Sequence, residues 1–244
     1  MSPVSARPLS IIMPAHDEAQ LLEQSVTDIA NAAIGQPFEV IVVENGSRDE
    51  TPAIAARLAS ERGEVRVVTL PAADYGAAMR AGVLAATGWA VVVFDVDYYD
   101  VDFLHAAVDL LEPTPESPAI VVGSKRAPGA CDDRPWHRRA VTAVLGLVLR
   151  LGFGLRVSDT HGMKALRREA VEPVVRQCRS ARDLFDTELI LRCERAGLRI
   201  AELPVAVSER RPSRSPIWRR IPRTLLGLVA LRIAFWRGDE GGKP

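Results

Sequence analysis

The chain has 244 residues, of which 48% are hydrophobic, which is enough for one sizeable core and about one α/β domain. Lysine plus arginine and aspartate plus glutamate both number 31, and the resulting formal net charge of zero argues against non-specific binding to nucleic acid. The three cysteines, Cys131, Cys178 and Cys193, lack metal-ligand spacing, so we expect them to be reduced thiols. No run reaches the roughly 18–20 uncharged apolar residues that a membrane span requires.

The first half of the chain alternates short apolar runs with segments of helical pattern. The apolar runs are rich in valine and isoleucine and span residues 9–13, 38–43, 65–70 and 90–94. The helical segments between them span residues 18–33, 51–60 and 76–86. Buried strands that alternate with helices predict an α/β fold with a Rossmann-like, mostly parallel sheet and helices on both faces. Ligands of such sheets bind in the crevice at the carboxyl ends of the strands.

Polar residues follow each of these four predicted strands. The four sets are Pro14-Ala15-His16-Asp17-Glu18, Glu44 to Asp49, Pro71 to Gly76, and Asp95-Val96-Asp97. Asparagine, aspartate and glycine are also ordinary turn and capping residues, so each set alone has a purely structural explanation. Because all four sets would meet at one edge of the sheet, we predict a ligand site there.

Two carboxylates separated by one residue, Asp95 and Asp97, follow the fourth strand. Residues i and i+2 of an extended segment point to the same side, so the pair would face one point. Such a pair suits a hard divalent cation, Mg²⁺ or Mn²⁺, which could bridge the phosphates of a nucleotide diphosphate and neutralise charge on the leaving group. The sequence has neither a phosphate loop nor the glycine-rich fingerprint of dinucleotide-binding folds, which removes the main support for those two classes of site.

Two basic, apolar helices are predicted in the second half of the chain. Residues 128–135 indicate a loop, and residues 138–153 indicate a helix with one apolar side made of Val141, Val144, Leu145, Val148 and Leu151. Residues 217–236 combine leucines and aromatic side chains with several arginines. Helices of this composition can lie in a membrane interface, and they can also pack on the domain as ordinary amphipathic helices. The sequence leaves both explanations open.

Several cations and a hydroxyl group could hold a phosphate. Arg138 and Thr142 are four residues apart and share a face of the predicted helix, where a guanidinium and a hydroxyl could grip a phosphate from two sides. Further positive charge could come from Lys125, Arg126, Arg210, Arg211 and Arg214. Any one of these arginines could instead be a solvated surface cation.

The motifs together resemble the inverting family-two glycosyltransferases of GT-A fold, and within them the polyprenyl-phosphate sugar synthases typified by dolichyl-phosphate mannose synthase. The resemblance runs from about residue 9 to residue 215. Pro14 to Glu18 resembles the family's Pro-x-Tyr-Asn-Glu, Glu44 to Thr51 its Asp-Asp-Gly-Ser-x-Asp-x-Thr, and Asp95-Val96-Asp97 its Asp-x-Asp. The later segments that resemble family motifs are Gly123-Ser124-Lys125, Asp159 to Lys164, Phe185 to Leu189, Glu202 to Val205 and Arg210 to Ser215.

The resemblance implies site residues for a donor, a metal ion and an acceptor. The predicted nucleotide-sugar-binding residues are Pro14, Ala15, His16, Glu18, Glu44, Asn45, Asp74, Asp95 and Asp97, of which Asp95 and Asp97 would also bind the metal. The acceptor phosphate would be held by Lys125, Arg138, Thr142, Arg210 and Arg214. The predicted catalytic residues are Asp97, Arg138 and Thr142.

Some positions depart from the family pattern. Asp17 replaces the usual asparagine, and Tyr99 stands where a glutamine often assists the metal. Glu44-Asn45 replaces Asp-Asp, which keeps a carboxylate but lengthens it. Lys125 replaces an arginine and lacks the bidentate fork of a guanidinium.

The expected function is transfer of a hexose, mannose or glucose, from a GDP- or UDP-sugar to a polyprenyl or dolichyl phosphate, with inversion. Residues 1–215 would form the GT-A domain, with an acceptor-side helix at about 138–153, and residues 216–244 a basic apolar C-terminal helix and tail. We expect the protein to lie in the cytoplasm, peripherally bound to a membrane. A membrane-protein subunit is a further candidate partner, and binding to nucleic acid is not expected. Two alternatives are a family-two enzyme with a glycan or small-molecule acceptor, and a non-catalytic nucleotide-sugar-binding subunit.

Overall fold

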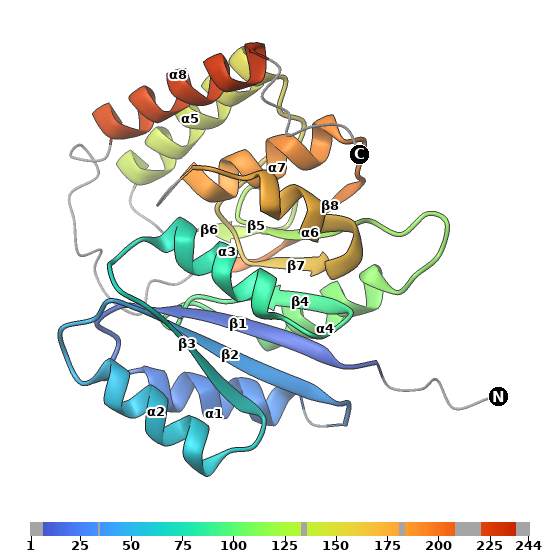
Figure 1. Ribbon diagram of the computed structural model, residues 1–244. Coiled ribbons are helices and arrows are strands. Elements are labelled where there is room, and N and C mark those ends of the chain that lie inside the picture. Colours follow the sequence, from blue (N-terminus) through green and yellow to red (C-terminus); the bar gives the residue numbers. More distant parts are fainter. Residues whose placement is uncertain (1–6, 34, 133–135, 181–183, 208–220, 238–244) are drawn as a thin grey trace.

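The computed structural model describes residues 7–33, 35–132, 136–180, 184–207 and 221–237. A seven-stranded sheet with the strand order β3-β2-β1-β4-β7-β5-β8 forms its centre (Figure 1). Its strands are β1 (Leu9–Ala15), β2 (Phe38–Asn45), β3 (Val65–Leu70), β4 (Ala90–Val93), β5 (Ile120–Ser124), β7 (Lys164–Arg167) and β8 (Ile200–Pro204). Neighbouring strands run parallel except at β7, which is antiparallel to both β4 and β5. The mostly parallel sheet predicted from the apolar runs is therefore confirmed.

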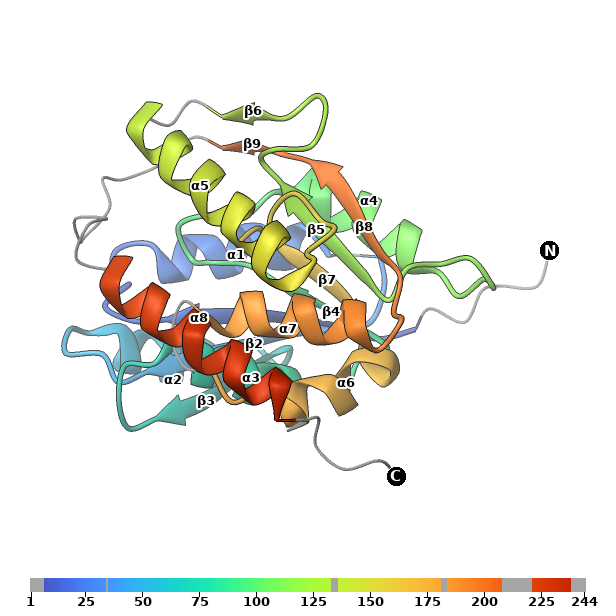
Figure 2. The same cartoon turned by 90° about the horizontal axis from the view of Figure 1, so that it is seen from above.

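Helices cover both faces of this sheet. On one face lie α1 (Leu22–Ala32), α2 (Thr51–Glu61) and α4 (Val101–Leu111). On the other face lie α3 (Tyr75–Ala85), α6 (Arg168–Gln177) and α7 (Phe185–Arg195). Two further helices, α5 (Trp136–Phe153) and α8 (Ile221–Trp236), form an outer layer beyond α7 (Figures 1 and 2). The central strands β1 and β4 are buried along their whole length, as expected for strands covered on both faces.

Strand β1 continues through Pro14, although the sequence predicted that the strand would end before it. The N–H of Leu9 donates to the β2 side and the carbonyl of Ile12 accepts from the β4 side, so even-numbered positions of β1 face β4. Pairing of β1 with β4 stops at Ile12. The nitrogen of Pro14 therefore faces β4 beyond the last β1–β4 pair, so the lack of an N–H group there removes no hydrogen bond from the sheet.

Helix α1 begins at Leu22, four residues later than predicted. The reason is tertiary, because the N–H groups at the predicted start are used elsewhere. The N–H of Glu18 donates to Thr51 Oγ1 at 2.7 Å, and the N–H of Ala19 donates to Asp49 Oδ2 at 3.1 Å. These bonds hold residues 18 and 19 as a loop against the segment that follows β2.

The second half of the chain contains elements that the sequence did not reveal. Residues 128–135 were predicted as a loop, and they include the short strand β6 (Cys131–Asp132), which pairs in parallel with β9 (Ala206–Val207). Strands of two residues are too short to show a hydrophobic period.

Cys178 and Cys193 are buried free thiols, and burial raises the pKa of Cys193 to about 12. Within the described ranges, every helix is too short or too polar to cross a bilayer.

Candidate active site

A pocket of about 150 Å³ opens at the carboxyl ends of β1, β2 and β4. Six of the predicted nucleotide-sugar-binding residues line it, namely Pro14, His16, Glu18, Asn45, Asp95 and Asp97. Tyr75 and Val96 complete the lining. The rule that ligands bind at strand ends therefore places most of the predicted donor residues around one pocket.

The other three predicted donor residues have structural partners beside the pocket. Ala15 is fully buried at the end of β1. The carboxylate of Glu44 accepts a hydrogen bond of 2.7 Å from the N–H of Ser47. The carboxylate of Asp74 caps α3 by accepting a hydrogen bond of 3.0 Å from the N–H of Ala77. Direct contact of these three residues with a donor stays a prediction.

Hydrogen bonds join the loop after β1 to the loop after β2, next to the pocket. Asp17 has a positive φ of 55°, which aspartate and asparagine tolerate better than most residues. Its Oδ1 accepts a hydrogen bond of 2.8 Å from the N–H of Arg48, and its own N–H donates to Ser47 Oγ at 3.1 Å. Asp17, which stands where the family has asparagine, thus forms a sharp turn and accepts a hydrogen bond from the neighbouring loop.

Asn45 connects three segments around the pocket. Its backbone carbonyl lies 2.9 Å from Nδ1 of His16, and its Oδ1 accepts a hydrogen bond of 2.9 Å from the N–H of Asp74. The next residue, Gly46, has a φ of 66°, and a Cβ there would lie 2.8 Å from the backbone of Ala72. Only glycine fits this approach without a shift of the backbone. The wall of the pocket is therefore fixed by backbone contacts.

Asp95 and Asp97 belong to a tight turn after β4, in which the N–H of Tyr98 donates to the carbonyl of Asp95 at 3.1 Å. The pKa of Asp95 is raised to about 6, chiefly by burial and then by the negative charges of Asp97 and Asp186. Lys164 and a hydrogen bond from the Tyr75 hydroxyl act in the opposite direction. The site therefore concentrates negative charge that its own cations do not fully balance.

These residues fit a hard divalent cation. The negative charges of Asp95 and Asp97 repel each other, and a bound cation would relieve this repulsion. Both side chains offer oxygen ligands. Within the described part of the chain, no group of three or more His, Cys, Asp and Glu side chains could hold a metal ion by itself. A cation at Asp95 and Asp97 would therefore need further oxygens from a ligand or from water.

Tyr75 is a pocket residue that the site prediction did not include. It is the first residue of α3, directly after the capping residue Asp74, and its hydroxyl donates to Asp95. A signal was present in the sequence, because Tyr75 lies in the polar set that follows the third predicted strand. Which residue of such a set turns towards the pocket depends on where the helix begins.

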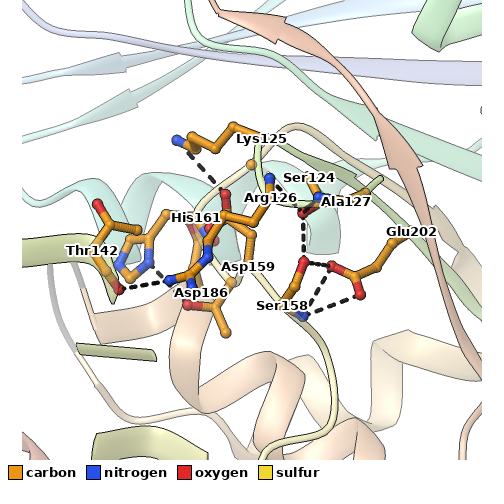
Figure 3. A network of polar contacts seen from close by, with 12 residues as sticks. Ser124, Lys125, Arg126, Ala127, Thr142, Ser158, Asp159, His161, Asp186 and Glu202 are labelled. Carbon is orange, nitrogen blue, oxygen red and sulfur yellow. Dashed lines mark hydrogen bonds and ion pairs between the residues drawn. The ribbon is translucent and has the colours of Figure 1, made fainter. Parts of the chain in front are cut away.

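A second group of predicted residues lies where β5, α5 and the segment before β7 meet. Lys125 Nζ is 3.8 Å from Asp159 Oδ2, and Arg126 Nη1 donates to the backbone carbonyl of Thr142 at 3.1 Å (Figure 3). The structure thus links the loop that carries Lys125 to α5 through Arg126, and binding of an acceptor phosphate there stays a prediction. Arg138 lies one turn before Thr142 on α5, and its side chain is outside the described residues, as are Arg210 and Arg214.

A buried ion pair lies between the two groups. Lys164 Nζ is 3.1 Å from Asp186 Oδ2 and donates to the carbonyl of Gly162 at 2.7 Å. Lys164 is 1% exposed and Asp186 is 3% exposed. The charge of Asp186 acts on Asp95, and that of Lys164 acts on both Asp95 and Asp159. Both residues occur in the family-like motifs, but the sequence did not indicate that they pair.

The family follows from comparison with known proteins. Residues 10–175, more than half of the chain, match the family described as Glycosyl transferase family 2. The chain belongs to this family. The predicted resemblance and the predicted enzyme class, a glycosyltransferase, are thereby confirmed.

Named relatives agree with this family. The chain is 33% identical to glycosyltransferase AglD of Haloferax volcanii over 81% of its own length, but spans only 32% of that larger protein. It is 32% identical to an uncharacterized glycosyltransferase of Mycobacterium tuberculosis, covering 94% of this chain and 96% of the relative. It is 28% identical to the dolichyl-phosphate beta-glucosyltransferase of Mus musculus, covering 86% of this chain and 70% of the relative.

Solved structures confirm the GT-A fold. Glucosyl-3-phosphoglycerate synthase from Mycobacterium tuberculosis, in complex with Mn²⁺, uridine diphosphate and glucosyl-3-phosphoglycerate, matches with a TM-score of 0.63 and 23% identity. The match covers 98% of this chain and 81% of the synthase. TarS of S. aureus, in complex with UDP-GlcNAc, matches with a TM-score of 0.60 and 16% identity over 93% of this chain and 66% of TarS.

Proposed function

We propose that this enzyme transfers a hexose, glucose or mannose, from a UDP- or GDP-sugar to a polyprenyl or dolichyl phosphate, with inversion and with a divalent metal ion. One observation carries the choice of a lipid phosphate as acceptor. Lys125, a cation suited to phosphate, lies where the loop after β5 meets α5, and α5 exposes an apolar surface along its length. The dolichyl-phosphate beta-glucosyltransferases among the relatives support this acceptor class.

The donor would occupy the pocket at the strand ends. Pro14, His16 and Asn45 lie on its wall, where a nucleoside could pack and form hydrogen bonds. Mg²⁺ or Mn²⁺, when bound by Asp95 and Asp97, would neutralise the charge that develops on the diphosphate leaving group. The metal-bearing donor complexes of the structurally similar synthase support a cation in this role.

The acceptor needs little chemical activation in this mechanism. The second pKa of a phosphate monoester is about 6, so the attacking oxygen is already largely ionised at neutral pH. Lys125, Thr142 and Arg138 would bind and orient the phosphate, and the enzyme would mainly align the reactants and exclude water. A strong general base is not required, because no proton has to be removed from the nucleophile.

The outer helices would seat the enzyme on a cytoplasmic membrane surface. Large apolar side chains of α5 and α8 are exposed, among them Trp136, Leu147, Leu151, Leu226, Val229 and Trp236. Exposed arginines of the same two helices, including Arg139, Arg150 and Arg223, could pair with anionic head groups. We propose residues 216–244 as the membrane-binding element and residues 1–215 as the catalytic domain. A membrane-protein subunit could also use this surface.

The replacement Asp97→Ala tests the donor half of the proposal. It should abolish metal-dependent binding of UDP or GDP and reduce transfer to background, since one of two metal ligands is lost. Isothermal titration calorimetry with Mn²⁺, followed by a radiolabel assay with a short polyprenyl phosphate, would measure both effects. The matched control is Asp109→Ala, an exposed carboxylate on α4. Full activity of Asp97→Ala, or transfer only to a water-soluble phosphate ester, would contradict the proposal.

A further inference from the structure

The segment between α5 and β7 is held by carboxylates from two other elements. Glu194 of α7 accepts hydrogen bonds from the N–H of Arg156 at 3.0 Å and from that of Val157 at 3.2 Å. Glu202 of β8 accepts from the N–H of Ser158 at 3.0 Å. Three consecutive N–H groups, on residues 156–158, are therefore bound by two acidic side chains. We call Glu194 and Glu202 the carboxylate clamp.

Ser158 connects the clamp to the loop that carries Lys125. Its Oγ donates to Glu202 Oε1 at 2.5 Å and lies 2.7 Å from Ser124 Oγ (Figure 3). Ser124 Oγ in turn accepts from the N–H groups of Arg126 at 3.2 Å and Ala127 at 3.1 Å. The direction of these bonds is consistent, because each hydroxyl can donate one hydrogen and still accept others. One network thus fixes the backbone at residues 126–127 and at residue 158, in the two segments that carry Lys125 and Asp159.

Asp159 directly follows the clamped residues and faces Lys125. Its side chain is almost fully buried, and its Oδ1 accepts from the N–H of His161 at 3.0 Å. Its Oδ2 has no hydrogen-bond partner within the described ranges and lies 3.8 Å from Lys125 Nζ. Burial alone would raise the pKa of Asp159, but Lys125, the His161 N–H and nearby positive charges hold this pKa below its usual range. Asp159 is therefore a charged carboxylate with one oxygen left for Lys125.

We propose that Glu194 and Glu202 are positioning residues that set Asp159 opposite Lys125, and that Asp159 holds the Lys125 ammonium in place until the phosphate of an acceptor binds it. A lysine has a long, flexible stem and lacks the planar fork of the arginine that the family uses here, so its direction must come from a partner. The clamp and the ion pair follow from the contacts between these residues. Only the arrival of a phosphate rests on the proposed function.

Lysine labelling tests this arrangement without any substrate. The chain has three lysines, Lys125, Lys164 and Lys243, and the buried Lys164 reports on whether a variant has kept its fold. Acetylation with a water-soluble reagent, read by mass spectrometry, gives a separate rate for each. We expect slow labelling of Lys125 in the native protein and a severalfold faster rate in Asp159→Asn, because the opposing charge is lost.

Two further variants test the clamp itself. Glu202→Ala and Ser158→Ala should also accelerate labelling of Lys125 severalfold. Glu202→Gln should restore most of the protection, because an amide can accept from the N–H of Ser158 and donate to its hydroxyl. Glu116→Ala, an exposed glutamate in the loop before β5, is the matched control and should change nothing. If Glu202→Ala also exposes Lys164, Ser158→Ala and Glu202→Gln decide the result.

The outcomes separate the parts of the inference. Unchanged labelling of Lys125 in Asp159→Asn would overturn the ion pair. Unchanged labelling in Ser158→Ala and Glu202→Ala, with Asp159→Asn accelerated, would overturn the clamp. In transfer assays, Ser158→Ala should raise KM for the acceptor and leave the Kd of the nucleotide unchanged. If labelling behaves as expected but no variant alters use of a polyprenyl phosphate, the clamp stands and the proposed acceptor fails.

Discussion

At the scale of single residues, the charge of Asp95 lowers the free energy of unfolding of the protein when no cation is bound. The folded protein raises the pKa of Asp95 from 3.8 to about 6, mainly through burial. The folded state therefore holds a proton more tightly than the unfolded chain between these two values. The free energy of unfolding consequently falls as the pH rises through this window, and the destabilisation is complete above about pH 6.

Asp95→Asn should therefore stabilise the metal-free protein at high pH and not at low pH. Allowing for the partial exposure of this residue, we expect a gain of about 1–2 kcal/mol in the free energy of unfolding at pH 8, and almost none at pH 4. Urea unfolding in the presence of a chelator at both pH values would measure it. Added Mn²⁺ with UDP should stabilise the native protein but not the variant. An equal gain at both pH values would show that charge is not the cause.

Arg138 is predicted to act on the acceptor and not on the donor. A charge-assisted hydrogen bond to phosphate contributes about 1.5–3 kcal/mol, so Arg138→Ala should weaken acceptor use about ten- to a hundredfold. Arg138→Lys should recover part of this loss. The neighbouring Arg139, which is exposed on α5, provides the control variant Arg139→Ala. Calorimetry of donor binding and kinetics with a polyprenyl phosphate should separate the two effects, and equal damage to both would contradict an acceptor role.

At the scale of elements, α8 packs on the domain through some of its apolar side chains and exposes others. Leu228, Leu231 and Phe235 are buried against the domain. The Phe235 ring lies 4.0 Å from the Arg195 guanidinium of α7 and 6.3 Å from the Phe153 ring of α5. Other apolar side chains of the helix, among them Leu226 and Trp236, are exposed. The helix therefore packs on the domain through one side and keeps apolar side chains exposed on the rest of its surface.

Two neighbouring aromatic residues of α8 test this division. Phe235 is 6% exposed and Trp236 is 85% exposed. Phe235→Ala should release α8 from α7, because replacing a buried phenylalanine costs about 3–5 kcal/mol of packing. Amide hydrogen exchange across residues 221–237 should then accelerate, with little change in β1 and β2. Trp236→Ala should leave exchange in α8 unchanged, and faster exchange there would mean that Trp236 contributes to docking.

At the scale of the whole molecule, the pocket at the strand ends and the exposed apolar surface belong to different parts of one fold. The pocket lies at the carboxyl ends of β1, β2 and β4, and the apolar surface is made by side chains of α5 and α8. These two helices lie beyond α7, on its side away from the sheet (Figure 1). Lys164 of the buried Lys164–Asp186 pair acts electrostatically on Asp95, which lines the pocket, and on Asp159, the partner of Lys125. The proposed transfer from a water-soluble donor to a lipid-anchored phosphate would use both parts.

Membrane binding can be tested with vesicles. The protein should sediment with vesicles that contain anionic lipid at low salt, and high salt should release part of it, because salt screens surface charge. Leu151→Glu and Leu226→Glu should weaken this association, since each places a charge within the exposed apolar surface. Leu110→Glu on α4, on the other side of the sheet, is the matched control. Equal loss with Leu110→Glu, or no sedimentation of the native protein, would remove the membrane role.

The residues that line the pocket at the strand ends were largely predictable from the sequence, and the contacts around Lys125 were not. Strand ends are marked by local composition, so the amino-acid sequence alone was enough to place Asp95, Asp97 and Asn45 together. Tyr75 was missed because its direction depends on the first turn of α3. Asp159 and Glu202 belong to family-like segments, but their contacts, and those of Glu194, were not predicted. Acidic residues far apart in sequence give no local sign of which backbone segment they will bind.

The sequence by itself determined the fold class, the first four strands and the family. Each of these follows from short-range patterns: apolar runs, helical periods and motifs within a few residues. The tertiary structure decided where α1 begins, why β1 can contain Pro14, and which carboxylates pair with Lys125 and Lys164. The physical reason is that hydrogen bonds and ion pairs between distant segments depend on burial and direction. Those are properties of the packed chain and leave no period in the sequence.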